Sequence, residues 1–157
     1  MNAAHLAKKF GLEKHPEGGY FKQTYRSDKI VDVEGYEGSR NIATAIYYML
    51  AGNDFSAFHR IKSDEIWHYY AGGTVTLYAI DKDGRLSKTR IGKNGVFQVI
   101  IKAGTWFAAA LDNTRSYCLL GCTVSPGFDY RDWELGKRDE LARVYPQHRK
   151  VIERYTK

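Results

Sequence analysis

The chain has 157 residues and a formal net charge of +6, and its apolar and charged fractions, 43% and 27%, are those of a folded globular protein rather than a disordered or fibrous one. Acidic residues interleave with the basic ones along the whole sequence, so no nucleic-acid partner is expected. No apolar run reaches the ~18 residues of a membrane span, and the start lacks the apolar core of a signal peptide, which predicts a cytoplasmic protein without a membrane partner. The length predicts a single domain, residues 1–157.

The N-terminus is expected to form a short helix. Asn2 can cap it, apolar side chains recur at helical spacing, and Gly11 supplies a C-terminal stop. The sequence His15-Pro16-Glu17-Gly18-Gly19 then precedes a first strand, Tyr20 to Arg26. Residues 27–39 are polar and charged and predict a surface loop.

From Arg40 onward, apolar runs alternate with turn sequences. Asp83-Gly84 and Asn94-Gly95 are typical of tight hairpins, and Gly72-Gly73 marks a further turn. The expected strands are 41–50, 55–61, 65–70, 74–80, 86–91, 96–101, 106–110 and 115–124. Together with the first strand, they predict an all-β sandwich or barrel.

The tail after Ser125-Pro126-Gly127 changes to helical periodicity. Apolar side chains recur over 141–145, Pro146 interrupts them, and they resume over 151–155. Two short helices that close the end of the barrel are expected.

The two cysteines, Cys118 and Cys122, lie four residues apart in one predicted strand. This spacing places them on one face and beyond disulfide distance. Free, buried thiols in a reducing compartment are expected.

The segment 58–72 holds two histidines and two acids within ten residues. His59 and Glu65 are the candidate catalytic residues, because a carboxylate can orient an imidazole and stabilise its protonated form. The alternative for His59 is a hydrogen-bonded side chain in the wall of the barrel. Side chains alternate along a strand, so His68 faces away from Glu65 unless a bulge intervenes.

Several aromatic residues are candidates for ligand binding. If Glu65 faces the lumen, Trp67 and Tyr69 do so too, and an aromatic pocket with a few polar groups suits a flat ring or a sugar face. Phe107 and Tyr117 are further candidates. Core packing is the alternative for all four.

A second group of candidates flanks the double glycine. Glu17 and Tyr20 are expected either at a pocket mouth, where glycine lets the backbone approach a ligand, or in a turn with a packing tyrosine. Lys22 and Arg26 are expected on the same face as Tyr20, either facing an anionic substrate or as solvated charges.

Two segments resemble the cupin motifs. In the first motif, His-x-His-x(3–4)-Glu-x(6)-Gly, the matching residues are His59, Glu65 and Gly72, and Ile61 replaces the second histidine. In the second, Pro-x-Gly-x-x-His, Gly104 matches and Phe107 replaces the histidine.

These departures bear on metal binding. By this resemblance, a metal-dependent cupin holds its ion with three histidines and one glutamate. Only His59 and Glu65 remain here, and His68 is a third candidate only if it breaks the strand alternation. We therefore expect a metal-free polar cluster and no cofactor.

Four longer segments resemble the family often called the fifth cupin family. They are residues 15–21, 63–68, 103–107 and 124–128, and the resemblance extends over nearly the whole chain. It implies a double-stranded β-helix, the cupin or jelly-roll barrel, with a short N-terminal helix, short C-terminal helices and a pocket inside the barrel. It also implies a homodimer.

The resemblance leaves several functions open. Metal-free cupins that epimerise dTDP-keto-sugars imply that His59, with Glu65, removes a proton next to a carbonyl. The ligand would then be a small, anionic or sugar-nucleotide-like metabolite. A non-catalytic small-molecule binding module and a metal-dependent enzyme are the alternatives.

Overall fold

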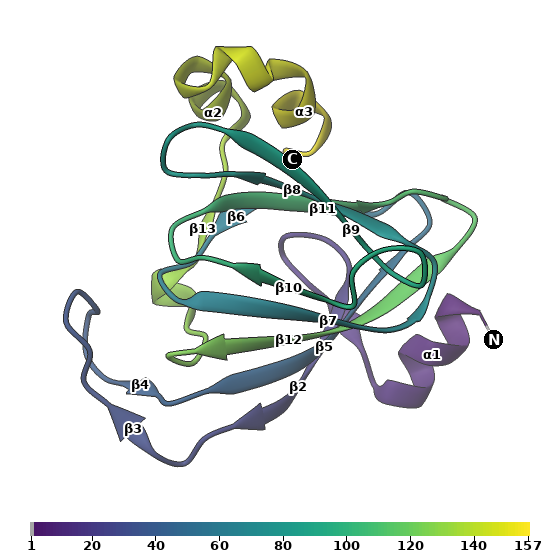
Figure 1. The fold of residues 1–157 in the computed structure, drawn as a ribbon. Coiled ribbons are helices and arrows are strands. Elements are labelled where there is room, and N and C mark those ends of the chain that lie inside the picture. Colours follow the sequence, from purple (N-terminus) through teal and green to yellow (C-terminus); the bar gives the residue numbers. More distant parts are fainter. Residues whose placement is uncertain (1) are drawn as a thin grey trace.

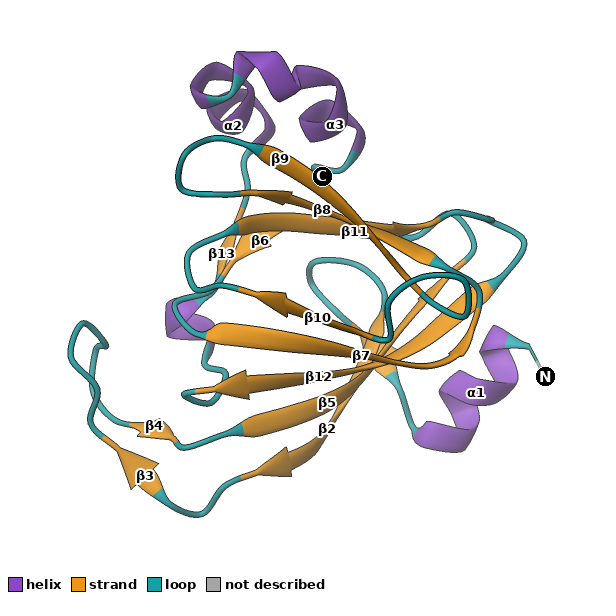
Figure 2. Cartoon of the chain, viewed as in Figure 1, coloured by secondary structure: helices purple, strands orange, loops and turns teal. Residues whose placement is uncertain are grey.

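The computed structural model describes residues 2–157 as two antiparallel β-sheets that face each other (Figures 1 and 2). The six-stranded sheet has the order β1 (Glu13–Lys14), β2 (Tyr20–Arg26), β5 (Thr44–Ala51), β12 (Tyr117–Ser125), β7 (Asp64–Gly72) and β10 (Gln98–Ile101). The five-stranded sheet has the order β13 (Glu134–Leu135), β6 (Phe55–Arg60), β11 (Trp106–Leu111), β8 (Val75–Ile80) and β9 (Leu86–Ile91). The predicted all-β jelly-roll architecture is confirmed.

Each of the nine predicted strands is present, with ends that differ by three residues at most. The predicted loop over 27–39 contains one short strand, β3 (Ile30–Val31), which pairs with β4 (Arg40–Asn41). This ribbon projects from the body of the molecule (Figure 1).

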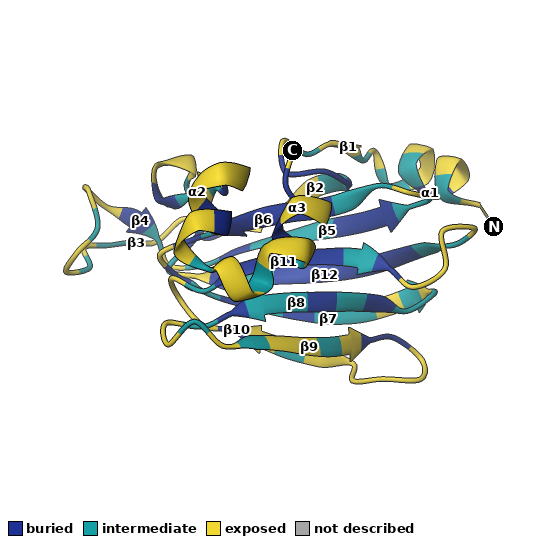
Figure 3. Ribbon diagram, turned by 90° about the horizontal axis from the view of Figure 1, so that it is seen from above, coloured by how far each residue is buried: buried dark blue, intermediate teal, exposed yellow. Residues whose placement is uncertain are grey.

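The side chains of β11 show that the five-stranded sheet separates two apolar layers. Phe107 and Ala109 point into the core between the sheets. Trp106 and Ala108 point outward, where α2 (Arg138–Val144) and α3 (Arg149–Arg154) cover them. The prediction that these helices close the end of the barrel is therefore wrong: they lie across the outer face of the five-stranded sheet (Figure 3).

The helix α1 (Ala3–Phe10) packs on the outer face of the other sheet. The side chain of Asn2 accepts a hydrogen bond from the backbone N–H of His5 at 2.9 Å, and Gly11 ends the helix in the left-handed conformation, as predicted. Leu6 is buried against Met49. Two 3-10 turns complete the chain, η1 (Tyr130–Asp132) and η2 (Pro146–His148).

No helix within residues 2–157 is long and apolar enough to cross a membrane. Cys118 and Cys122 are buried and unbridged, as expected. The cytoplasmic location and the homodimer stay predictions.

The loop that connects β1 and β2 lies directly on the backbone of β6. The carbonyl oxygen of Glu17 accepts a hydrogen bond from the N–H of Ala57 at 2.8 Å. Gly18 has φ +110°, and a Cβ built on it would overlap the carbonyl oxygen of Phe55. The double glycine therefore lets this loop approach neighbouring strands, and this close approach is what fixes the position of Glu17.

A methyl group at position 18 tests this contact. We expect Gly18→Ala to lower the free energy of unfolding by about 3 kcal/mol or more, because left-handed strain adds to backbone overlap. Urea denaturation would measure it. Gly35→Ala is the matched control, since Gly35 has φ +85° and a methyl group added there would have no atom within 4 Å, and should cost about 1 kcal/mol. Equal losses in the two variants would contradict a steric role for Gly18.

Candidate functional site

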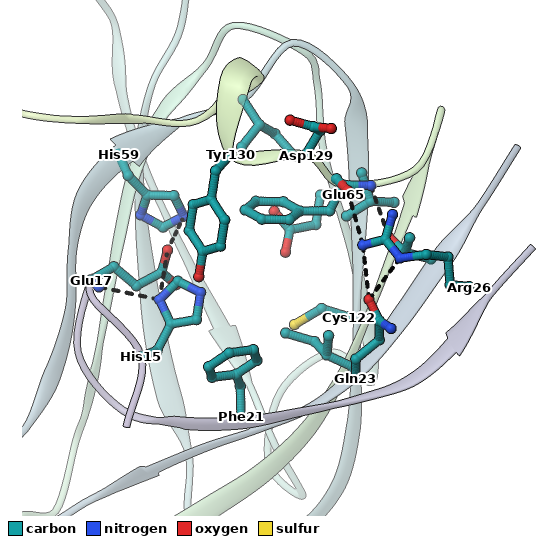
Figure 4. Close-up of a pocket in the computed structure, with 15 residues that line it drawn as sticks. His15, Glu17, Phe21, Gln23, Arg26, His59, Glu65, Cys122, Asp129 and Tyr130 are labelled. Atoms are coloured by element: carbon teal, nitrogen blue, oxygen red, sulfur yellow. Dashed lines mark hydrogen bonds and ion pairs between the residues drawn. The ribbon is translucent and has the colours of Figure 1, made fainter. Parts of the chain in front are cut away.

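A cavity of about 390 Å³ lies between the six-stranded sheet and β6. Its volume is in the range of small-molecule sites. Figure 4 shows polar side chains at both ends and aromatic rings between them. The apolar lining consists of Phe21, Ile46, Ile61, Val124 and Phe128. The polar lining includes His15, Glu17, Gln23, Arg26, Thr44, His59, Glu65, Asp129 and Tyr130.

His59 is held at both ring nitrogens. Its Nδ1 lies 2.7 Å from the carbonyl oxygen of Ala57, and because a carbonyl only accepts, Nδ1 carries a hydrogen. Its Nε2 lies 3.1 Å from Oε2 of Glu17. One proton must therefore lie between the imidazole and the carboxyl group, and the pair has no net charge whichever partner holds it.

Glu17 receives two more hydrogen bonds. The Ser56 hydroxyl donates to Oε1 at 3.0 Å, and the indole N–H of Trp133 donates to Oε2 at 3.3 Å. Donors stabilise an ionised carboxylate. The shared proton is therefore assigned to His59, which makes a buried ion pair with Glu17.

His15 lies on the other side of the same carboxylate. The backbone N–H of Glu17 donates to its Nδ1 at 3.1 Å, so the neutral ring carries its hydrogen on Nε2. Burial lowers the pKa of His15, opposed by the charge of Glu17 and assisted by that of His59, so the ring is neutral near pH 7. Its Nε2–H has no hydrogen-bond partner among residues 2–157 and can donate to a ligand.

Glu65 is buried on the opposite sheet. Burial raises its pKa to about 8, and the charge of Glu17 raises it as well, while hydrogen bonds from Trp67 and Cys122 lower it. The Trp67 indole donates to Oε1 at 3.0 Å. Glu65 is therefore a neutral carboxylic acid near pH 7. Burial also raises the pKa of Cys122, whose thiol is protonated.

Tyr130 reaches the cavity from η1, after strand β12. Its ring packs against Phe128 and Trp133, with centroid distances of 5.0 and 5.7 Å. A buried bidentate ion pair holds η1 in place, with Nε and Nη2 of Arg40 at 2.7 and 2.8 Å from the carboxylate of Asp132. Partial burial, with the charge of Glu17, raises the pKa of Tyr130, so its hydroxyl keeps its proton.

A β-bulge turns Arg26 toward the cavity. The pairing of β2 with β5 shifts after Gln23, and Thr24 is the extra residue. A bulge reverses the alternation of the side chains that follow it, so Gln23 and Arg26 both line the cavity. Lys22 lies on the opposite face. The prediction that Lys22 and Arg26 share a face is wrong for this reason.

The structure brings four of the predicted candidates to the cavity, namely Glu17, Arg26, His59 and Glu65. The predicted contact between His59 and Glu65 is replaced by the contact with Glu17, since both nitrogens of His59 are already engaged. His15 and Tyr130 were missed as site residues, although each lies within or just after a segment that carries the family resemblance.

The remaining predicted ligand-binding side chains do not line the cavity. Tyr20 and Tyr117 pack in the apolar cluster beneath α1. Trp67 and Phe107 are buried in the core between the sheets, and Tyr69 packs at its edge. These placements follow the core-packing alternative.

The donor set does not fit the metal site of a metal-dependent cupin. Ile61 and Phe107 stand where histidines would be needed, and both nitrogens of His59 are engaged. His68 points to the other face of its strand, where Nε2 lies 3.1 Å from the hydroxyl of Thr123. No group of three His, Cys, Asp or Glu side chains in the described part of the chain is placed to hold a metal ion.

Comparisons with known proteins agree with this architecture. A family model described as "Cupin superfamily (DUF985)" matches residues 4–136. The uncharacterized protein YML079W of Saccharomyces cerevisiae is 33% identical over 154 residues, which cover 87% of this chain and 76% of that protein.

Solved structures extend the comparison. Protein SO0799 from Shewanella oneidensis has a TM-score of 0.91 at 33% identity, covering 100% of this chain and 98% of that one. A hypothetical protein from Leishmania major has a TM-score of 0.90 at 33% identity, covering 99% of both chains. Oxalate decarboxylase from Bacillus subtilis has a TM-score of 0.57 at 15% identity, covering 90% of this chain and 36% of that one, and shares the fold alone.

Replacing the buried acid tests its protonation state. Glu65 takes up a proton on folding between its ordinary pKa of 4.5 and its folded value of about 8. Its contribution to the free energy of unfolding therefore falls as the pH rises through this window. Glu65→Gln keeps a neutral side chain, so we expect its stability relative to the wild type to increase by a few kcal/mol between pH 5 and pH 8.

Urea denaturation at the two pH values measures this difference. The exposed Glu13→Gln is the control for removing a carboxylate from the surface. A difference between Glu65→Gln and the wild type that does not change with pH would show that Glu65 is ionised in the folded protein.

Proposed function

The chain belongs to the cupin superfamily, in the family described as DUF985, and we propose that its pocket is a metal-independent acid–base site for isomerising a small carbonyl metabolite. One observation carries the proposal: two carboxyl groups in contrasting environments line the same cavity. Glu17 is surrounded by donors, whereas burial holds the pKa of Glu65 near 8. Such pairs are how enzymes assign a base and an acid at neutral pH.

Glu17 is the base in this proposal. Its carboxylate removes a proton from the carbon next to the substrate carbonyl, and the C–H electron pair forms the double bond of an enediol. Glu65 gives its proton to the carbonyl oxygen in the same step. Glu17 then returns the proton to the former carbonyl carbon. In the same step Glu65 recovers a proton from the hydroxyl group on the carbon that was first deprotonated, which becomes the new carbonyl carbon. An epimerisation shares the first step.

His59 is a positioning residue in this scheme. It has no free nitrogen for a substrate, because Ala57 and Glu17 occupy both. Its role is to hold the Glu17 carboxylate and to stabilise the ionised form. This differs from the sequence-based hypothesis, in which His59 itself takes the proton.

Deuterium exchange tests the acid–base chemistry. The probes are aldoses, ketoses and their uronic acids, incubated with the protein in D₂O and followed by proton NMR. We expect exchange at the carbon next to the carbonyl of at least one probe, and a loss of about 100-fold or more in Glu17→Gln. Glu13→Gln, an exposed glutamate in the neighbouring strand β1, is the control and should exchange at the wild-type rate.

Undiminished exchange by Glu17→Gln would contradict the role of Glu17. A probe that raises the melting temperature of the wild type without any exchange would favour the alternative, a non-catalytic binding module. One observation favours this alternative: Glu17 already accepts three hydrogen bonds, which make its carboxylate a weaker base.

Metal analysis tests independence from metal. After growth with iron, manganese, nickel and zinc supplied, we expect far less than one metal ion per chain, because the donor set lacks a third ligand. His59→Ala should have the same metal content as the wild type. Near-stoichiometric metal that is lost in His59→Ala would overturn this expectation.

A further inference from the structure

The titratable groups that line the cavity, counted together with Arg131, the ion-pair partner of Asp129 outside the lining, sum to one positive charge at neutral pH. The charges of His59 and Glu17 sum to zero whichever of the two holds their shared proton. Asp129 is paired with Arg131, whose Nη2 lies 2.8 Å from Oδ2. The neutral groups are His15, Glu65, Cys122 and Tyr130. The remaining charge is the guanidinium of Arg26.

Arg26 is held in place by neutral acceptors only. The side-chain oxygen of Gln23 accepts from Nε at 3.0 Å and from Nη2 at 2.8 Å. Asn41 accepts from Nη1 at 2.8 Å, and the carbonyl oxygen of Phe128 accepts from Nη2 at 3.3 Å. No carboxylate in the described residues lies within 4.0 Å of Arg26, so its charge has no counter-ion. Four hydrogen bonds orient this exposed guanidinium, and one N–H remains for a ligand.

The two ends of the cavity have different chemistry. Arg26 and Gln23 lie at one end, and His15, Glu17 and His59 lie at the other (Figure 4). Besides Arg26, the side chains that line the cavity and have a polar hydrogen without a partner in the described residues include His15, Glu65 and Tyr130. These donors require a ligand with hydroxyl or carbonyl oxygens.

We propose that the substrate is a small organic acid with one negative charge, whose carboxylate binds Arg26 while its carbonyl or hydroxyl oxygens face Glu65 and His15. The inference rests on the proposed function for the identity of the site, and adds the substrate class. A guanidinium recognises a carboxylate by charge-assisted hydrogen bonds. The diphosphate of a sugar nucleotide carries more negative charge than this cavity neutralises, so the sugar-nucleotide expectation is narrowed to a monocarboxylate.

Binding of matched ligands tests the charge requirement. The probes are hydroxy- and keto-monocarboxylates up to the size of a hexuronate, each compared with its primary amide and with the corresponding dicarboxylate. Glucuronate, glucuronamide and glucarate form one such set. Thermal shift identifies binders and calorimetry measures Kd. We expect at least one monocarboxylate to bind at least about tenfold more tightly than its amide and its dicarboxylate.

Variants of strand β2 locate the charge. Arg26→Gln should weaken binding of that acid by about tenfold or more, and Arg26→Lys should weaken it less. Lys22→Gln removes the same charge from the opposite face of the strand and should leave Kd unchanged. Melting temperatures of the ligand-free variants show that each is folded.

The outcomes separate this inference from the proposed function. Equal binding of acid and amide, tighter binding of dicarboxylates, unchanged Kd in Arg26→Gln, or no binding by any monocarboxylate would overturn the inference. An acid that binds through Arg26 without deuterium exchange supports the inference and contradicts the acid–base chemistry. Deuterium exchange of neutral sugars, without tighter binding of the corresponding acids, would support the acid–base chemistry and contradict the inference.

Discussion

In the loop between β1 and β2, Glu17 and Gly18 lie against the backbone of strand β6, and a Cβ on Gly18 would overlap the carbonyl oxygen of Phe55. This contact places the carboxylate of Glu17 next to Ser56 and His59, both of which belong to β6. Because Gly18 has no Cβ, the carboxylate can be buried and still accept three hydrogen bonds. The position of the Glu17 carboxylate therefore depends on the absence of a Cβ at Gly18, the next residue along the chain.

Burial in the cavity changes the protonation of the groups around Glu17. Burial raises the pKa of Glu65 and holds it in its neutral form, and the charge of Glu17 adds to this effect. The same burial keeps His15 neutral. The cavity therefore combines a paired carboxylate, a carboxylic acid and one uncompensated guanidinium, an arrangement suited to an anionic ligand with a reactive carbonyl.

The strands could be predicted from the sequence, because hairpin turns and strand alternation are local properties, whereas the jelly-roll architecture followed from the family resemblance and the position of the C-terminal helices was predicted wrongly. The contacts between the site residues could be predicted only in part. The partner of His59 comes from a loop more than forty residues away, and alternation alone cannot identify such a contact. Arg26 was placed on the wrong face because a bulge at Thr24 leaves no clear mark in the sequence. His68 was assigned correctly to the outer face, since β7 keeps its alternation there.

The central claim is that Glu65 is a neutral acid in the folded protein at pH 7. Carbon-13 NMR of glutamate side-chain carboxyl groups, followed from acid to alkaline pH, measures this directly. We expect one carboxyl resonance to titrate with a midpoint of about 8 and to be absent from Glu65→Gln. If every glutamate carboxyl titrated near the ordinary value of 4.5, the cavity would hold two carboxylates and the assignment of base and acid would be wrong.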